Sequence, residues 1–170
     1  MRFSAKLFRL FFSSLWLAVF STATASADVV VSTVPQLVTA VNNTGSGGDR
    51  TILIADGTYN LNGQYLRITV GGVTVRSQSG KRERVVLDGN YQTTEIFQIV
   101  ASNVVIADLT LKRAVDHPVH VMGGASDNVL NTLIRNVHII DPGEQAIKVN
   151  PSGSYGAHLG TVRNSLIELT

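Results

Sequence analysis

The chain of 170 residues contains no cysteine, so its fold cannot depend on disulfide bonds. Aromatic residues are scarce, at 6% of the sequence, and the only tryptophan is Trp16. Beyond residue 27, the aromatic side chains are Phe97, Tyr59, Tyr65, Tyr91 and Tyr155. Since sugar rings commonly stack on aromatic side chains, a lectin that relies on such platforms is disfavoured.

Charge of either sign is also sparse, with 14 Lys and Arg against 12 Asp and Glu. Three of the basic residues, Arg2, Lys6 and Arg9, precede an apolar run of 11 residues and a small-residue segment that ends at Ala27. This order predicts a secretory signal peptide over residues 1–27, cleaved after Ala27, because the run is too short to span a bilayer. We therefore expect a secreted or periplasmic protein with no membrane span after cleavage.

Removal of residues 1–27 changes the charge balance to 11 − 12 = −1. A chain with this balance has no basic surface of the kind that nucleic acids require, so no nucleic-acid partner is expected. The length that remains is enough for one hydrophobic core. We expect a monomer.

Residues 28–48 are expected to form a short helix and a linker. Thr33 and Gln36 are spaced as a capping box, and Pro35 falls in the first turn, where its missing N–H costs nothing. One apolar stripe follows with helical spacing, namely Val34, Leu37, Val38 and Val41.

Residues 49–170 consist of short β-rich segments separated by Gly, Asn, Asp and Ser. Several of them repeat with an offset of 28 residues, which places Asp108 on Asn136 and His120 on Lys148, while an offset of 22 places Ile99 on Val121. Such repeats predict a parallel β-solenoid whose inward side chains stack about 4.8 Å apart. We predict an all-β, right-handed parallel β-helix with three sheets, a short N-terminal capping helix and coils that are incomplete at the C-terminus.

Three segments, GDRTILIADGTY (48–59), VVLDG (85–89) and SNVVIADLTL (102–111), resemble the opening coils of the right-handed parallel β-helix (pectin lyase-like) superfamily. The resemblance extends over residues 36–170 and is nearest to uncharacterised secreted bacterial β-helix repeat proteins. It implies a solenoid that acts on or binds an acidic polysaccharide. Catalytic motifs of the named enzymes are not matched: AVDHP lacks the Trp-Ile that precedes Asp-His in pectate lyases, and the Asp pair and Gly-His-Gly of polygalacturonases are missing.

Strand parity predicts one outward column of polar side chains. If Val119 and Val121 point inward, then His120 points outward, and the repeat places Gln98 and Lys148 on either side of it. For β-elimination on a uronic acid, Lys148 or His120 would be the base. Ordinary solvated ion pairs on a surface strand are the alternative interpretation of the same residues.

The residues around this column complete the predicted site. Gln98, Lys112, Arg113 and His117 are candidates for contacts with the substrate, and Asp116 with Glu144 are candidates for holding calcium, a hard ion that prefers carboxylate oxygens. His117 and His120 lie three residues apart, so on a regular strand they would point to opposite faces, which disfavours a shared metal.

Two functions follow from these observations. The first is an exported lyase or hydrolase that acts on an acidic polysaccharide along the outward groove. The second is a glycan-binding or structural scaffold of the cell envelope without catalysis. Since a fold alone does not determine a reaction, the choice depends on the geometry of the site.

Overall fold

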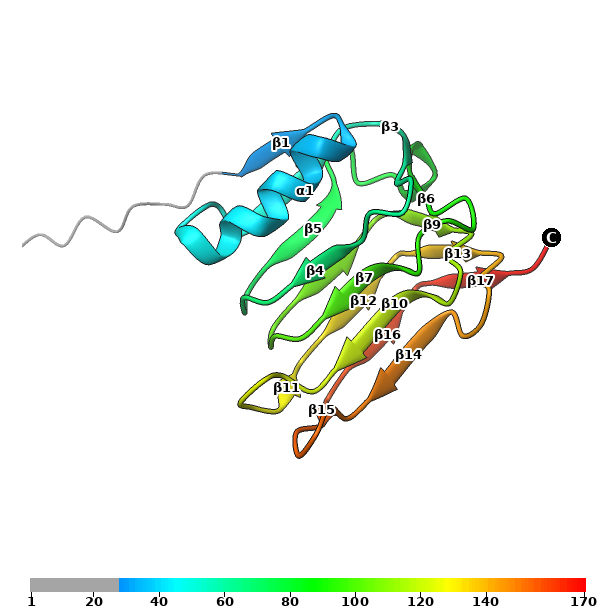
Figure 1. The fold of residues 1–170 in the computed structure, drawn as a ribbon. Coiled ribbons are helices and arrows are strands. Elements are labelled where there is room, and N and C mark those ends of the chain that lie inside the picture. Colours follow the sequence, from blue (N-terminus) through cyan, green and yellow to red (C-terminus); the bar gives the residue numbers. More distant parts are fainter. Residues whose placement is uncertain (1–27) are drawn as a thin grey trace, which may run out of the picture.

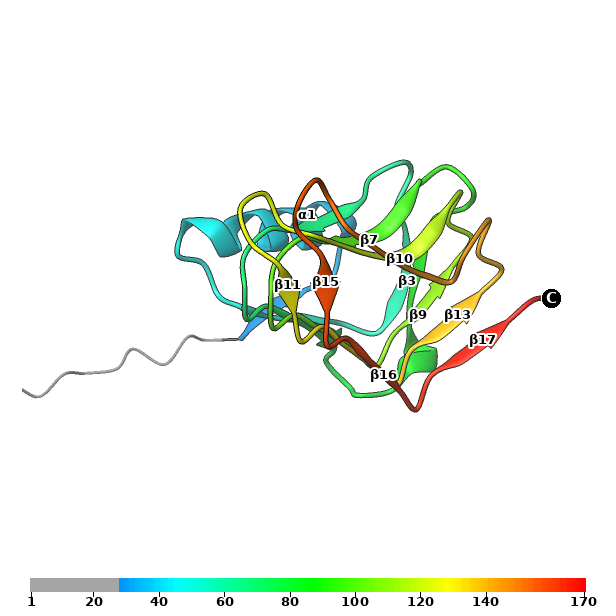
Figure 2. The same ribbon diagram turned by 90° about the horizontal axis from the view of Figure 1, so that it is seen from below.

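The computed structural model describes residues 28–170, so the predicted signal peptide lies outside the described residues. The chain coils through three parallel sheets that stack along one axis, as the sequence predicts, in a β-solenoid of about four turns (Figure 1). Seen along that axis, the successive coils lie behind one another (Figure 2). This confirms the solenoid and the register inferred from the repeats.

Each sheet takes one strand from each coil. Sheet 1 contains, in spatial order, β1 (Val29–Val31), β2 (Thr51–Ile54), β5 (Thr74–Ser77), β8 (Val105–Ala107), β12 (Leu133–Arg135) and β16 (Thr161–Arg163). Sheet 2 contains β3 (Gly57–Asn60), β6 (Val85–Asp88), β9 (Thr110–Lys112), β13 (His138–Ile140) and β17 (Leu166–Glu168). Sheet 3 contains β4 (Leu66–Ile68), β7 (Glu95–Ile99), β10 (His117–Met122) and β14 (Ile147–Asn150). A small extra pair joins β11 (Val129–Leu130) to β15 (Ala157–His158).

The core is made of inward ladders of apolar side chains, one per sheet. In sheet 3, Leu66 pairs with Phe97 and Phe97 with Val119, and all three side chains are at most 1% exposed. In the last strand of each sheet, the inward residues lack a stacking neighbour on one side within the described residues. Val149 and Ile167 are accordingly 58% and 55% exposed. Burial therefore rises from these strands toward the middle of the solenoid.

The N-terminal end of the core is covered by α1 (Val34–Asn43), which packs against β1, β2 and β4 and is followed by the 3-10 turn η1 (Thr44–Ser46). The Thr33 hydroxyl accepts a hydrogen bond from the Gln36 amide at 3.3 Å, as the capping box predicts. The Gln36 side chain, however, accepts from the amide of Ser32 at 2.9 Å, one residue earlier than expected. Within 28–48, β1 was not predicted; it pairs with β2 and starts sheet 1.

Corners between the sheets use left-handed residues. Asp108, Asn136 and Asn164 all have φ between 51° and 58°, a conformation that Asn and Asp tolerate better than most residues. The side-chain amide of Asn136 donates to the Asp108 carboxylate at 2.9 Å, so the two residues that the repeat aligns are stacked at this corner. The corner at Asp108 separates β8 from β9. A second 3-10 turn, η2 (Arg82–Arg84), precedes β6.

Candidate functional site

Four outward side chains of sheet 3 form one column along the solenoid axis. The strand register pairs Arg67 with Gln98, Gln98 with His120 and His120 with Lys148, in consecutive coils about 4.8 Å apart. We call these four residues the outward column. The sequence predicted Gln98, His120 and Lys148 in this order, and the structure confirms their alignment and adds Arg67.

His120 is buried within this column rather than solvated. Its side chain is 9% exposed, and its Nδ1 lies against the Glu95 carboxylate, which also accepts a hydrogen bond from Gln98 at 2.9 Å. Its Nε2 faces the side-chain oxygen of Asn150, whose amide nitrogen donates to the Pro151 carbonyl at 2.7 Å. Both ring nitrogens therefore have a polar partner. Held in this way, His120 offers no free lone pair to a substrate.

The two cations of the column differ from His120 because they have no partner. Lys148 is half-buried and Arg67 is exposed, and neither makes a hydrogen bond or ion pair with any residue of 28–170. Beside Gln98 is a hollow of about 260 Å³ that is lined by Tyr65, Thr94, Glu95 and Gln98. Tyr65 is 44% exposed, so one aromatic side chain is available next to the column.

His117 lies closer to His120 than strand parity predicted. The two rings meet edge to face at the start of β10, with centroids 5.3 Å apart. The expectation that they point to opposite faces was therefore wrong. His117 is buried, its Nδ1 has no hydrogen-bond partner, and its Nε2 is 3.7 Å from the Glu144 carboxylate.

Asp116 and Glu144 occupy equivalent turns in consecutive coils, as predicted, and the Glu144 amide donates to the Asp116 carbonyl at 2.9 Å. Calcium takes about six to eight oxygen ligands, many more than two carboxylates supply. Within residues 28–170, no three His, Cys, Asp or Glu side chains gather where they could hold a metal ion. Calcium at Asp116 and Glu144 therefore stays a prediction, and further oxygen ligands would have to complete it.

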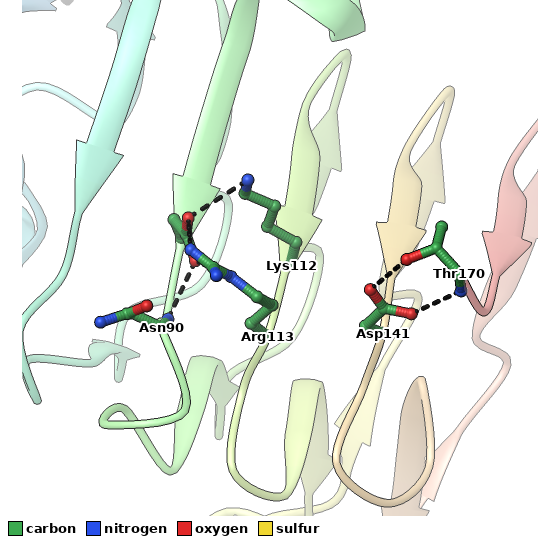
Figure 3. A network of polar contacts seen from close by, with 6 residues as sticks. Asn90, Lys112, Arg113, Asp141 and Thr170 are labelled. Atoms are coloured by element: carbon green, nitrogen blue, oxygen red, sulfur yellow. Dashed lines mark hydrogen bonds and ion pairs between the residues drawn. The ribbon is translucent and has the colours of Figure 1, made fainter.

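Lys112 and Arg113 contact a buried carboxylate instead of the outward column. Arg113 binds Asp88 through Nε at 3.0 Å and through a terminal nitrogen at 2.5 Å, and the Lys112 ammonium lies 3.3 Å from the same carboxylate (Figure 3). The Asn90 amide donates to Asp88 as well, at 2.9 Å. In the next coil, the Asp141 carboxylate accepts two hydrogen bonds from Thr170 (Figure 3). These corner residues join successive coils.

The contacts of Asp88 predict an acid-dependent loss of stability. Burial raises the pKa of Asp88, but the hydrogen bonds from Arg113, Asn90 and Lys112 lower that pKa by more, so it lies below its ordinary value of 3.8. Ionised Asp88 therefore stabilises the fold above pH 3.8, and this contribution disappears as the pH falls through the lowered pKa. We expect Asp88→Asn to lose about 1–3 kcal/mol of unfolding free energy at neutral pH.

Urea unfolding of the wild type and of Asp88→Asn over a pH series measures this effect. The difference between their unfolding free energies should shrink as the pH falls below 3.8, because the wild-type carboxyl is then protonated as well. A difference that stays constant over the whole series would contradict the assignment.

The sequence did not predict Arg67, Glu95 or Asn150. Glu95 could have been found, since an offset of 22 places it on His117, where the structure pairs the two residues. Asn150 could have been found as the next outward position after Lys148. Arg67 is paired with Gln98 at an offset of 31, which matches neither repeat, and no sequence signal leads to it.

No model of a known protein family, no curated protein and no solved structure matches this chain. In the part of the chain that the structure describes, no helix combines the length and the apolar character needed to cross a bilayer. The fold therefore defines the class, a parallel β-solenoid with one capping helix, and the outward column is its candidate functional site.

Proposed function

We propose that this β-solenoid is exported and binds an acidic polysaccharide along the outward column. The observation that carries the proposal is the alignment of Arg67, Gln98, His120 and Lys148, whose two terminal cations have no partner within residues 28–170. Three steps of about 4.8 Å separate Arg67 from Lys148, so the column spans roughly 14 Å. A polymer that carries regularly spaced carboxylates matches such a row of donors.

The polar groups between the two cations suit sugar hydroxyls. Gln98 has one amide hydrogen bond to Glu95, and its carbonyl oxygen is available to accept a hydroxyl. Tyr65 lies beside it and offers a ring face to a sugar, which partly offsets the scarcity of aromatic side chains. Both features support a carbohydrate rather than another polyanion.

β-Elimination is the reaction for which the outward column provides a catalytic base. The base takes the proton from the carbon next to the uronate carboxylate, the C–O bond to the neighbouring sugar breaks, and the leaving oxygen takes up a proton. Lys148 is the base in this proposal, since both ring nitrogens of His120 are engaged. His120 then positions Asn150 and Glu95 beside the polymer.

The alternative, a glycan-binding or structural scaffold without catalysis, is favoured by the same engagement of His120. A buried imidazole fixed between two acceptors is a structural arrangement as well as a catalytic one. Calcium enters either function through Asp116 and Glu144 only where the polymer supplies the remaining oxygens. Both functions predict binding, and only the first predicts an unsaturated product.

Binding and cleavage are tested together on the folded mature protein. Pectate, alginate and glycosaminoglycans are incubated with it, with and without calcium, while affinity is measured by calorimetry and unsaturated uronates by near-ultraviolet absorbance. We expect one polymer to bind with an affinity that falls as the salt concentration rises. Lys148→Gln and Arg67→Gln should each weaken that affinity about tenfold, because each removes one charged hydrogen bond. Lys148→Gln should also abolish the rise in absorbance.

Arg163→Gln is the matched control, because Arg163 is an exposed cation in β16, on a different sheet. Its affinity should equal that of the wild type. Equal binding of neutral and acidic polymers, or wild-type affinity in both column variants, would contradict the proposal. Binding without an unsaturated product or new reducing ends would select the scaffold.

A further inference from the structure

A cavity of about 480 Å³ lies at the corner where the chain leaves sheet 3. Its volume falls within the range of about 300–1,000 Å³ that is common for small-molecule sites. Arg67 and Thr69 line it from the first coil, Ser102 from the turn after β7, and Ser126 and Asp127 from the loop after β10. Only Arg67 is shared with the outward column.

The cavity arises because this corner changes length between coils. Between β7 and β8 the chain uses residues 100–104, whereas between β10 and β12 it uses residues 123–132. The longer segment projects as a wall beside the shorter turn. A hydrogen bond from the Gly124 amide to the Asp127 carbonyl, at 3.0 Å, closes the base of this wall. The cavity is therefore built into the fold of the corner.

Two opposite charges line the cavity and are not paired with each other. Within residues 28–170, Arg67 has no partner, and the Asp127 carboxylate has one polar contact, the Ser126 hydroxyl at 3.4 Å. Ser102, in contrast, is engaged, since its hydroxyl accepts from the Leu130 amide at 3.0 Å. A guanidinium without a partner and a carboxylate with one long hydrogen bond, in one cavity, suit a ligand that presents both an anionic group and hydroxyl donors.

We propose that this cavity binds a single hexuronate unit of an acidic polysaccharide. Arg67 donates two parallel hydrogen bonds to the sugar carboxylate, and Asp127 accepts from its ring hydroxyls. The identity of the polymer rests on the function proposed above, whereas the cavity and its two charges do not. Arg67 belongs to both the outward column and the cavity, so a polymer on the column can place one of its sugars in the cavity.

Binding of monosaccharides separates the cavity from the column. D-Galacturonate and D-glucuronate are titrated into the labelled protein and followed by NMR, with D-galactose and D-glucose as neutral counterparts. We expect at least one uronate to bind about tenfold more tightly than its neutral counterpart, and Arg67→Gln to remove that difference. Asp127→Asn should weaken uronate binding about tenfold. In the wild type, shift changes on uronate binding should be confined to residues 67, 69, 100–102, 122–129 and 152, which line the cavity.

Two further variants make the outcome specific. Glu83→Gln removes an exposed carboxylate outside the cavity and should leave uronate binding unchanged. Lys148→Gln should weaken the binding of the polymer and leave the binding of the monosaccharide unchanged, because Lys148 does not line the cavity. Uronates that fail to bind, bind no better than neutral sugars, or bind Asp127→Asn as well as the wild type would overturn the proposal. If the polymer binds and no uronate does, the cavity proposal is overturned and the proposal for the outward column still stands.

Discussion

Phe97→Ala is expected to lower the free energy of unfolding by about 3–5 kcal/mol, the usual cost of removing a buried aromatic side chain. Phe97 is the only phenylalanine beyond residue 27, and its side chain is fully buried in β7. Leu66 and Val119 pack on either side of it in the inward ladder of sheet 3. No other aromatic residue in these coils can fill the space that alanine would leave.

Urea unfolding of Phe97→Ala and of Tyr65→Ala measures the effect. Tyr65 is the matched comparison, since it is an aromatic residue just before β4 that is 44% exposed and makes no hydrogen bond among the described residues. Its removal should change stability by less than about 1 kcal/mol. A loss below about 1 kcal/mol for Phe97→Ala would show that neighbouring coils collapse into the cavity, and would contradict a rigid, ladder-packed core.

The fold was predictable because a solenoid repeats its register. An offset of 28 residues connects His120 with Lys148 and Thr110 with His138, and the structure pairs both. Strand parity then determines which residues point inward. The strand β3 (Gly57–Asn60) was harder to recognise from the sequence. Its residues, GTYN, include one buried side chain and show no apolar alternation.

The site was only partly predictable because its remaining contacts cross irregular corners. The partner of Arg113 is Asp88, 25 residues earlier, and nothing in KRAV indicates that its cations are already bound. Likewise, a strand template places His117 and His120 on opposite faces, whereas their rings meet edge to face at the start of β10. Local pattern gives the direction of a side chain in a strand, but not in the turns that bring coils together.

The second large effect that we expect is a loss of stability when Gly143, in a turn between two sheets, is replaced by alanine. Gly143 lies in the turn before β14, and its amide donates to the Ala114 carbonyl at 3.1 Å. A Cβ atom on this glycine would overlap the carbonyl oxygen of Val115 and lie 2.9 Å from that of Ala114. Both are backbone atoms of the preceding coil, so a rotamer change cannot relieve the overlap and the turn itself must move.

Gly143→Ala is therefore expected to cost about 1–3 kcal/mol or more of unfolding free energy, and to impair the outward column as well. Lys148 is five residues downstream, and its register with His120 depends on how this turn stacks. Gly160→Ala is the control, since the nearest atom to its Cβ is 3.8 Å away. Unfolding by urea and affinity for the acidic polymer are measured on both variants. Wild-type stability in Gly143→Ala would contradict the close stacking of the turns, whereas a destabilised variant with full affinity would show that Lys148 binds the polymer without being held in register.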